Sequence, residues 1–411
     1  MKKRLKAGRF FMTSLLLCVI TCMSALVQLA EAVAPASTLP SIKIGSTSAL
    51  TGVAEPHGRN VTLGTQLYFD RINQTGGIQG RKIEFITLDN KYEPILAGAL
   101  TRQLIETDHV LALVGLHGSA IVAVVLPIVT EMKTLLFGVW SGPDSLYQVP
   151  ANRYVMNFRA SYGEEVAETI NGLLSIGVKP SEFAFFTQND PSGDSVYNAA
   201  INALKASGYQ DADRLPHGRY MRNTLNVELA LADILDQFKK APPKIMILGG
   251  LAEPNEKFFH LARKEFPHTR FVVISGQLNP KKLTKNDEDY VIATQIAPPL
   301  TLDLPAVREY KEDLQKYGKG ALPSYASFYT YIAARIFVVG LQQAVAQNKL
   351  TREGIIDVLE NLSNVDIGIG VPVSYSKTDH TAMHKVWVTV YKNGEFILTS
   401  WPKLKKTIST P

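Results

Sequence analysis

Two loops rich in glycine and serine each follow a stretch that reads as a buried strand. Residues 115–120 (GLHGSA) follow the predicted strand 110–114 and lead into a helix predicted over 119–132. Ligands of open α/β sheets bind beyond the carboxyl ends of the strands, where the free N–H groups of helix N-termini attract anions. Ser119 is therefore a candidate contact to an anionic ligand. The residues alone favour a simpler explanation, in which Ser119 is the N-cap of the helix.

The second loop, residues 137–144 (FGVWSGPD), follows the predicted strand 135–137. Trp140 reads either as an aromatic residue of the core or as a wall of a ligand pocket, and the sequence does not choose between the two. A secreted α/β hydrolase would place its nucleophile in a G-x-S-x-G motif, which residues 115–120 lack. No H-E-x-x-H, C-x-x-C or phosphate-binding glycine motif is present either. We therefore expect no enzyme, no metal site and no cofactor.

The first 32 residues read as a signal peptide. A basic start (KKR at 2–4) precedes an apolar stretch over 10–29 and a small-residue cleavage site, either AEA at 30–32 or APA at 34–36. A permanent membrane anchor is the alternative, because the apolar stretch approaches the length that spans a bilayer. We expect cleavage, since Thr, Ser and Gln residues dilute the stretch, and hence a protein exported to the periplasm.

Removal of this segment changes the composition of the chain. Cys18 and Cys22, the two cysteines of the chain, both lie in it, so no disulfide is expected in the mature protein. The formal charge of +6 falls to +2, because five basic residues and Glu31 leave with the segment. The basic balance therefore gives no reason to expect nucleic-acid binding. The lysines near the C-terminus read as a solvated end of the chain.

Apolar strands and amphipathic helices alternate along the rest of the sequence. The roughly 375 mature residues exceed the usual size of one domain, and strands that are apolar throughout are typical of parallel sheets covered on both faces. These features predict two doubly wound α/β lobes. Strands are expected at 42–47, 83–88, 110–114, 135–137, 183–186, 244–248, 271–274, 385–391 and 395–400, and helices at 58–73, 93–106, 119–132, 162–175, 192–207, 225–239, 254–265, 304–317, 324–346 and 351–362.

One stretch of the sequence points to a particular family. Residues 72–94 (INQTGGIQGRKIEFITLDNKYEP) are close to the pattern IN-x-x-GGI-x-G, strand, D. This pattern resembles the opening of the periplasmic solute-binding proteins related to the leucine/isoleucine/valine-binding protein. The resemblance implies the type I periplasmic binding protein fold, with two Rossmann-like lobes joined by three crossovers. Carried over, lobe 1 would comprise 41–159 and 294–367, and lobe 2 would comprise 160–293 and 368–402.

The resemblance also implies ligand contacts in lobe 1. Relatives bind a ligand carboxylate with a serine hydroxyl and neighbouring amides, and Ser119 stands at the position of that serine. At the next strand end, Ser141 would supply a second hydroxyl and Gly142 a closely approaching amide. His57 stands where relatives place an aromatic residue over the ligand, although a histidine in a surface loop is nearly as good an explanation. Trp140 departs from the small residue that is usual in relatives.

Lobe 2 departs further from the pattern of relatives. Ser192 stands where relatives have a tyrosine, and Leu251 follows a strand after which another tyrosine is common. Amino-acid binders place an acid at the position of Ser275 to pair with the ligand ammonium, which is costly to bury without such a partner. Asp190 or Glu253 would have to replace it, unless they are helix N-terminal charges favoured by the helix dipole. Relatives often have a disulfide at the positions that Tyr92 and Gly118 occupy here.

Together these features predict a receptor that captures a small solute between two lobes and delivers it to the membrane permease of an ABC importer. The solute would be amino-acid-like, an amide or a carboxylate, and the missing acid argues against a branched-chain amino acid. We expect a monomer without nucleic-acid partners. The alternatives are a ligand-sensing receptor or regulator on the same fold and, less well supported, a secreted hydrolase. Residues 216–225 (PHGRYMRNTL) have no explanation at the level of sequence.

Overall fold

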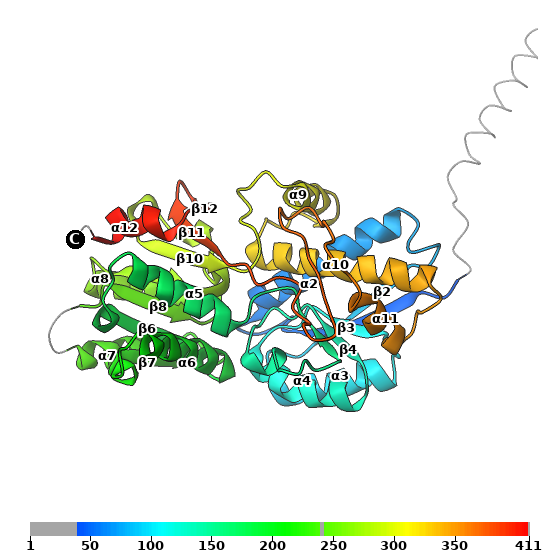
Figure 1. Cartoon of the computed structure of the whole chain (residues 1–411), viewed down its shortest axis with the longest axis horizontal. Helices are drawn as coiled ribbons and strands as arrows, with labels where there is room; N and C mark the ends of the chain where they lie inside the picture. Colours follow the sequence, from blue (N-terminus) through cyan, green and yellow to red (C-terminus); the bar gives the residue numbers. More distant parts are fainter. Residues whose placement is uncertain (1–38, 239–241, 410–411) are drawn as a thin grey trace, which may run out of the picture. The chain divides into compact units, whose positions relative to one another are not determined.

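The protein is built on two separate β-sheets, each covered by helices (Figure 1). A computed structural model describes residues 39–238 and 242–409. We call the part around the first sheet lobe 1 and the part around the second sheet lobe 2. The expected two-lobed α/β fold with parallel sheets is confirmed. The predicted signal peptide lies outside the described residues.

The five strands of lobe 1 are all parallel, in the order β2-β1-β3-β4-β5. Successive side chains point to opposite faces, so Leu136 lies in one core cluster while Leu135 and Phe137 lie in another. Both faces of β3 and β4 are therefore buried, which explains why these two strands read as continuous apolar runs. The strands are β1 (Ile42–Ser48), β2 (Ile83–Asp89), β3 (Ala112–Val114), β4 (Leu135–Phe137) and β5 (Val155–Met156).

Helices from distant parts of the sequence cover this sheet. The long helix α10 packs along α2 (Figure 1), and the contact is close because Gly64 has no side chain: a Cβ there would lie 1.9 Å from the carbonyl oxygen of Ser327. Side chains of α9, α10 and α11 share one core cluster with β1, β3 and β4. The helices of lobe 1 are α2 (Glu55–Gln74), α3 (Pro94–Glu106), α4 (Ser119–Glu131), α9 (Pro305–Tyr317), α10 (Tyr325–Ala346) and α11 (Arg352–Leu359).

The sheet of lobe 2 has the strand order β12-β11-β10-β9-β8-β6-β7. Its first five strands along the chain are parallel, and the last two pair antiparallel at one edge. The strands are β6 (Phe183–Asn189), β7 (His217–Met221), β8 (Ile245–Gly249), β9 (Arg270–Val273), β10 (Val291–Gln295), β11 (Trp387–Lys392) and β12 (Glu395–Leu398). The helices are α5 (Tyr162–Ser175), α6 (Pro191–Ala206), α7 (Glu228–Gln237), α8 (Ala252–Glu265) and α12 (Trp401–Ser409).

Three strands and one α-helix of the described residues were not expected from the sequence: β5, β7, β10 and α12. Helix α12 packs on lobe 2, because Trp401, Leu404 and Ile408 are buried in its core. The lysines between them are exposed, as expected for a solvated surface.

The domain bounds given above stay a prediction. Ile369, Val373, Tyr375 and Met383 pack in the core of lobe 1, and the segment that contains them leads back to β11 of lobe 2 as the last crossover. Among the described residues, no helix has the length and apolar character needed to cross a membrane.

Candidate functional site

A pocket lies between the carboxyl ends of strands from both sheets, where open α/β sheets bind ligands. With its open mouth it spans about 400 Å³, but the space that can hold the centre of a water-sized molecule is only about 20 Å³. Lobe 1 contributes residues from the start of α2 and from the loops after β2, β3 and β4. The lining residues are His57, Tyr92, Gly118, Trp140, Ser141, Tyr162, Gln188, Ser192, Val196, Gly249, Gly250, Leu251, Ile274, Ser275 and Gln277.

The pocket gathers most of the residues singled out from the sequence. Six of them line it: His57, Trp140, Ser141, Ser192, Leu251 and Ser275. The other four do not line it but are close to lining residues in the chain: Ser119, Gly142, Asp190 and Glu253. The expected strand ends therefore meet at one place, and the role of each side chain in ligand binding stays a prediction.

Ser119 is the first residue of α4 and does not cap it. The N-cap is Gly118, and no side chain makes a capping hydrogen bond there, so the interpretation of Ser119 as an N-cap was wrong. Ser119 is only 1% exposed, and its Oγ has no hydrogen-bond partner among the described residues. A buried hydroxyl without a partner is costly, and this one stands beside the free N–H groups of a helix N-terminus.

Ser141 and Gly142 have distinct local roles. The N–H of Gly118 donates to Oγ of Ser141 (2.7 Å), which leaves the serine proton available to donate elsewhere. A Cβ on Gly142 would lie 2.9 Å from Cζ of Arg159, so the proximity of this guanidinium explains the glycine.

Trp140 is both a core residue and a wall of the pocket. Its ring makes edge contacts with Tyr329 and His57, at centroid distances of 4.8 and 5.2 Å. The indole Nε1 of Trp140 and Nε2 of His57 are buried without hydrogen-bond partners within the described ranges. Burial lowers the pKa of His57 to about 4, so the ring is neutral at pH 7. An indole N–H can only donate, so Trp140 offers an unused donor.

His117 lies directly behind this wall. The N–H of Ala49 donates to its Nε2 (3.3 Å), and burial holds the pKa of His117 well below its usual value. A neutral imidazole that accepts at Nε2 has its proton on Nδ1. That Nδ1 has no partner in the described part of the chain. His117 also stacks on the ring of Tyr92, with centroids 5.4 Å apart.

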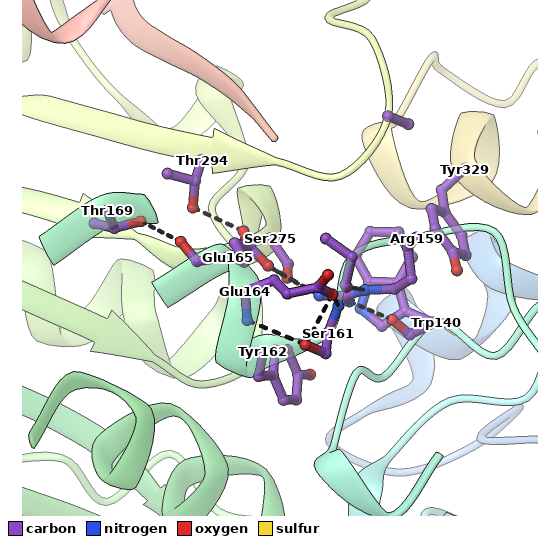
Figure 2. A network of polar contacts seen from close by, with 12 residues as sticks. Trp140, Arg159, Ser161, Tyr162, Glu164, Glu165, Thr169, Ser275, Thr294 and Tyr329 are labelled. Carbon is purple, nitrogen blue, oxygen red and sulfur yellow. Dashed lines mark hydrogen bonds and ion pairs between the residues drawn. The ribbon is translucent and has the colours of Figure 1, made fainter. Parts of the chain in front are cut away.

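Ser275 is held by a buried ion pair between the lobes (Figure 2). Glu165 accepts from both the N–H and the hydroxyl of Ser275, each at 2.6 Å, and from Oγ1 of Thr294 at 2.7 Å. Nη2 of Arg159 donates to the same carboxylate (2.9 Å), and Nη1 donates to the carbonyl oxygen of Trp140 (2.6 Å). Arg159 and Glu165 are fully buried. This network joins the pocket loop of lobe 1 to that of lobe 2.

Asp190 is the N-cap of α6 and is occupied by local contacts. Its carboxylate accepts from the N–H groups of Ser192 and Gly193 at 2.9 and 3.3 Å, and from Nε2 of Gln188 at 2.6 Å. The hydroxyl of Ser192 in turn contacts that of Tyr162 (3.4 Å). The interpretation of Asp190 as a helix N-terminal charge is confirmed by this geometry.

Glu253 lies in the first turn of α8, two residues after Leu251. Its Oε2 is buried and has no partner among the residues described, and burial raises the pKa of its carboxyl. The neighbouring Leu251 packs onto a core cluster of lobe 1, so the start of α8 faces the other lobe.

Several lining residues were not identified from the sequence. Gln188 is the last but one residue of β6, and its amide contacts the hydroxyls of Tyr92 and Tyr220 at 3.4 and 2.8 Å. Its position at a strand end was the available signal. Tyr92 was noted only as the position of a disulfide in relatives, and its ring packs against Gly118.

The pocket therefore offers neutral donors on the lobe 1 side and hydrogen-bonded loops on the lobe 2 side. Among residues 39–238 and 242–409, no group of three His, Cys, Asp or Glu residues could hold a metal ion. The arrangement suits reversible binding of a small polar solute.

Comparisons with known proteins agree with this geometry. A crystal structure of a possible leucine/isoleucine/valine-binding protein from Rhodopirellula baltica is 33% identical, with a TM-score of 0.83 over 90% of this chain and 99% of that one. A fatty acid ABC transporter substrate-binding protein from Thermomonospora curvata is 23% identical, with a TM-score of 0.76 over 90% of this chain and 95% of that one.

The curated "Amino acid binding protein" of Pseudomonas aeruginosa is 26% identical over 193 residues, which are 38% of this chain and 50% of that protein, so the match spans only half of its length. The family model for periplasmic binding proteins matches residues 41–395. This family consists of solute-binding proteins rather than enzymes. With most of the sequence matched by the family and the fold shared throughout, the chain belongs to the periplasmic binding protein family.

Proposed function

We propose that this protein is a periplasmic receptor that captures a small carboxylate solute between its two lobes and delivers it to an ABC importer. One observation carries the proposal: three polar atoms of the pocket wall or directly beside it are buried without partners in the described residues. They are Oγ of Ser119, Nε1 of Trp140 and Nε2 of His57. Buried polar groups in native proteins are almost always hydrogen-bonded, so unused ones in a pocket favour a polar ligand.

The chemistry of these atoms favours an acceptor-rich ligand. The indole offers only a donor, and the serine hydroxyl can donate, while the first N–H groups of α4 point out of the helix N-terminus. A carboxylate has two oxygens and about four lone-pair sites, and it is also favoured by the helix dipole. Because His57 and His117 are neutral, binding would rely on hydrogen bonds rather than on a free cation.

Two acids near the pocket, Glu165 and Asp190, argue against an α-amino acid. Glu165 already accepts from Arg159, Ser275 and Thr294, and Asp190 caps α6. The four contacts of Glu165 fill its lone-pair sites, and Asp190, which accepts three hydrogen bonds, does not line the pocket. A ligand ammonium left without a carboxylate partner is costly to bury. The Thermomonospora curvata protein is named for a fatty acid, a solute with a carboxylate and no ammonium.

A second candidate is an amino-acid solute whose ammonium pairs with Glu253. The observation that favours it is the buried Oε2 of Glu253, which has no partner within the described chain. Burial raises the pKa of this carboxyl, so a nearby ammonium would stabilise its charged form.

The proposed mechanism is closure of two lobes around the solute. The solute binds first to lobe 1 through Ser119, Ser141 and the N-terminus of α4, and lobe 2 then covers it. Only a solute with higher affinity for the closed form can drive this change. No covalent step takes part. The closed protein, which we expect to be a monomer, would then be recognised by the membrane permease.

A thermal-shift screen tests the proposal, because a ligand that binds only the folded state raises the melting temperature. The panel pairs each acid with its nearest relatives: benzoate with benzamide, hexanoate with hexanamide, and L-leucine with 4-methylpentanoate. Shifts with the acids alone would support the carboxylate receptor. A shift with L-leucine that is lost in Glu253→Gln would support the second candidate. If no compound of the panel shifts the melting temperature, a receptor or regulator that senses a ligand of another chemical class would be favoured.

Replacing Ser119 tests the site itself. Ser119→Ala should weaken binding of a responding acid by about 1–3 kcal/mol, because a hydrogen bond to a charged group is lost. Isothermal titration calorimetry measures this change. Ser195→Ala is a matched control, since that hydroxyl donates to the carbonyl oxygen of Pro191 within α6 and Ser195 does not line the pocket. Equal affinities of the wild type and Ser119→Ala would rule out this contact.

A further inference from the structure

The turn after β7 reaches from lobe 2 to lobe 1. Nη2 of Arg222 lies 3.1 Å from Oε2 of Glu93, and Nη1 of Arg222 donates to the carbonyl oxygen of Tyr92. Nδ2 of Asn223 donates to Oε1 of Glu93 (2.7 Å) and to the carbonyl oxygen of Lys91 (3.3 Å). The guanidinium of Arg222 also lies over the ring of Tyr92, 5.5 Å from its centroid. These contacts join the segment that the sequence left unexplained to the turn after β2.

The turn on lobe 1 is organised to receive these groups. The N–H of Tyr92 donates to Oδ1 of Asn90 (2.8 Å), and the N–H of Lys91 donates to Oδ1 of Asp89 (3.0 Å). Lys91 and Tyr92 both adopt left-handed backbone conformations, with φ of 51° and 60°. This conformation is uncommon for residues other than glycine and needs such side-chain support. It turns the carbonyl groups of Lys91 and Tyr92 toward lobe 2.

Tyr92 connects this contact to the ligand loop. Its ring lines the pocket, stacks on His117 and fills the space over Gly118, where a Cβ would lie 2.6 Å from Cε2. Its hydroxyl accepts from Nε2 of Gln188 in lobe 2 (3.4 Å). Arg222 therefore contacts the loop that opens α4 through the side chain of Tyr92, which is only 2% exposed.

We propose that Arg222 and Asn223 form an interlobe clasp with Tyr92 and Glu93, and that Arg222 is a positioning residue that sets how long the solute stays bound. This inference rests on the proposed function. The four residues belong to different lobes, so their contacts exist only when the lobes are close and stabilise the closed form alone. A contact that stabilises only the closed form slows release more than it changes capture.

Stopped-flow kinetics with benzoate as the probe tests the clasp. Arg222→Ala should raise the dissociation rate constant about tenfold, which corresponds to about 1.4 kcal/mol, with little change in the association rate constant. Arg222→Lys retains the charge but not the planar fork, and should recover part of the loss. Arg214→Ala is the matched control, because Arg214 is 81% exposed and pairs with Asp211 three residues away. A dissociation rate unchanged by Arg222→Ala would overturn the clasp.

A second measurement does not depend on the solute. Spin labels on cysteines placed at Leu229 in lobe 2 and Leu322 in lobe 1, which are 76% and 73% exposed, report the distance between the lobes. Cys18 and Cys22 are replaced by serine in every variant. Without solute, the wild type should have a larger short-distance population than Arg222→Ala, and identical distributions would overturn the clasp. If no member of the panel binds while the distributions differ, the proposed function fails and the clasp stands.

Discussion

At the scale of single residues, Arg159 and Glu165 form a fully buried ion pair beside the pocket (Figure 2). Both side chains are fully buried. Besides the ion pair with Arg159, the Glu165 carboxylate accepts hydrogen bonds from the N–H and the hydroxyl of Ser275 and from the hydroxyl of Thr294. Removing one partner of such a pair leaves an uncompensated charge in a dry environment.

Glu165→Gln should therefore destabilise the fold by about 3–5 kcal/mol, because Arg159 keeps its charge and loses its counterion. Urea unfolding followed by circular dichroism measures the change. Glu168→Gln is a control on the same helix, since that carboxylate accepts a hydrogen bond from Nε1 of Trp401 rather than from a buried guanidinium. A loss no larger in Glu165→Gln than in the control would contradict this account of the pair.

Gly118 offers a second test at this scale, because two effects can be separated there. Its φ of 95° disfavours any side chain, and a Cβ would also lie 2.6 Å from the ring of Tyr92. Gly177 has a φ of 99°, and a Cβ added there would have no atom within 4 Å, so Gly177→Ala reports the backbone cost alone. We expect about 1–2 kcal/mol for Gly177→Ala and a further 1–3 kcal/mol, approximately, for Gly118→Ala.

Chemical denaturation of the two alanine variants measures this difference. The clash at Gly118 should also weaken solute binding, because Tyr92 must move away from the loop that opens α4. Equal stability of the two variants would mean that the ring of Tyr92 moves aside without a measurable loss of folding free energy.

At the scale of elements, α12 completes the core of lobe 2. Trp401 is 7% exposed and donates from Nε1 to Glu168 of α5 (3.2 Å). Its ring fills the space over Gly172, where a Cβ would lie 2.1 Å from Nε1. Helix α12 therefore packs on α5 through the side chain of Trp401, which lies against Gly172.

Trp401→Ala should destabilise the protein by about 3–5 kcal/mol, because it removes a large buried side chain and leaves a cavity over α5. Differential scanning calorimetry measures the change in unfolding. Lys403→Ala, an exposed position on the same helix, should change stability by no more than about 0.5 kcal/mol. A small effect of Trp401→Ala would mean that α12 contributes little to the fold.

The strands and helices that were predicted differ in burial and composition from those that were missed. Strands such as β8 and β9 are buried on both faces and read as apolar runs, so they were predicted. Strand β7 pairs with β6 at the sheet edge, and its two buried residues are a glycine and a tyrosine, so the residue types do not alternate between apolar and polar although the burial does. Such a short polar edge strand has no distinct pattern. Helix α12 was missed because its apolar residues number only three.

Part of the candidate site could also be predicted from the sequence. Ser119, Ser141 and Trp140 could be located because they follow predicted strands, and parallel strands end at the same edge of a sheet. The clasp could not, because the contact of Arg222 with Glu93 depends on how two lobes meet, and the two residues are 129 positions apart. Likewise, local sequence does not reveal that the hydroxyl of Ser275 donates a hydrogen bond to Glu165, 110 positions away.

At the scale of the whole molecule, the last crossover is tied to lobe 2 by a histidine. His384 lies between Glu164 near the start of α5 and Asp379 in the crossover segment, with Nε2 3.2 Å from Oδ2 of Asp379. The hydrogen bond with Glu164, followed by that with Asp379, raises the pKa of His384 to about 9. Its side chain is 52% exposed, so solvent screens part of this interaction.

The raised pKa predicts a pH dependence of stability. The unfolded histidine has a pKa of about 6.5, so between pH 6.5 and 9 the folded protein binds more protons than the unfolded chain. The stabilisation by His384 should therefore be complete below pH 6.5 and lost as the pH rises to about 9. His57 and His217, whose pKa values burial lowers to about 4, are neutral in the folded protein throughout this window. Their contribution is the same in the wild type and in a His384 variant, so it cancels when the two are compared.

Urea unfolding at several pH values, with the wild type beside His384→Gln, isolates this contribution. The wild type should be more stable than the variant at pH 6.5, and the difference should shrink steadily until it vanishes near pH 9. Because the pair joins a crossover to lobe 2, the variant should also change the distance between spin labels on the two lobes in the same pH window. A stability difference that stays constant from pH 6.5 to 9 would show that His384 does not hold the crossover through its charge.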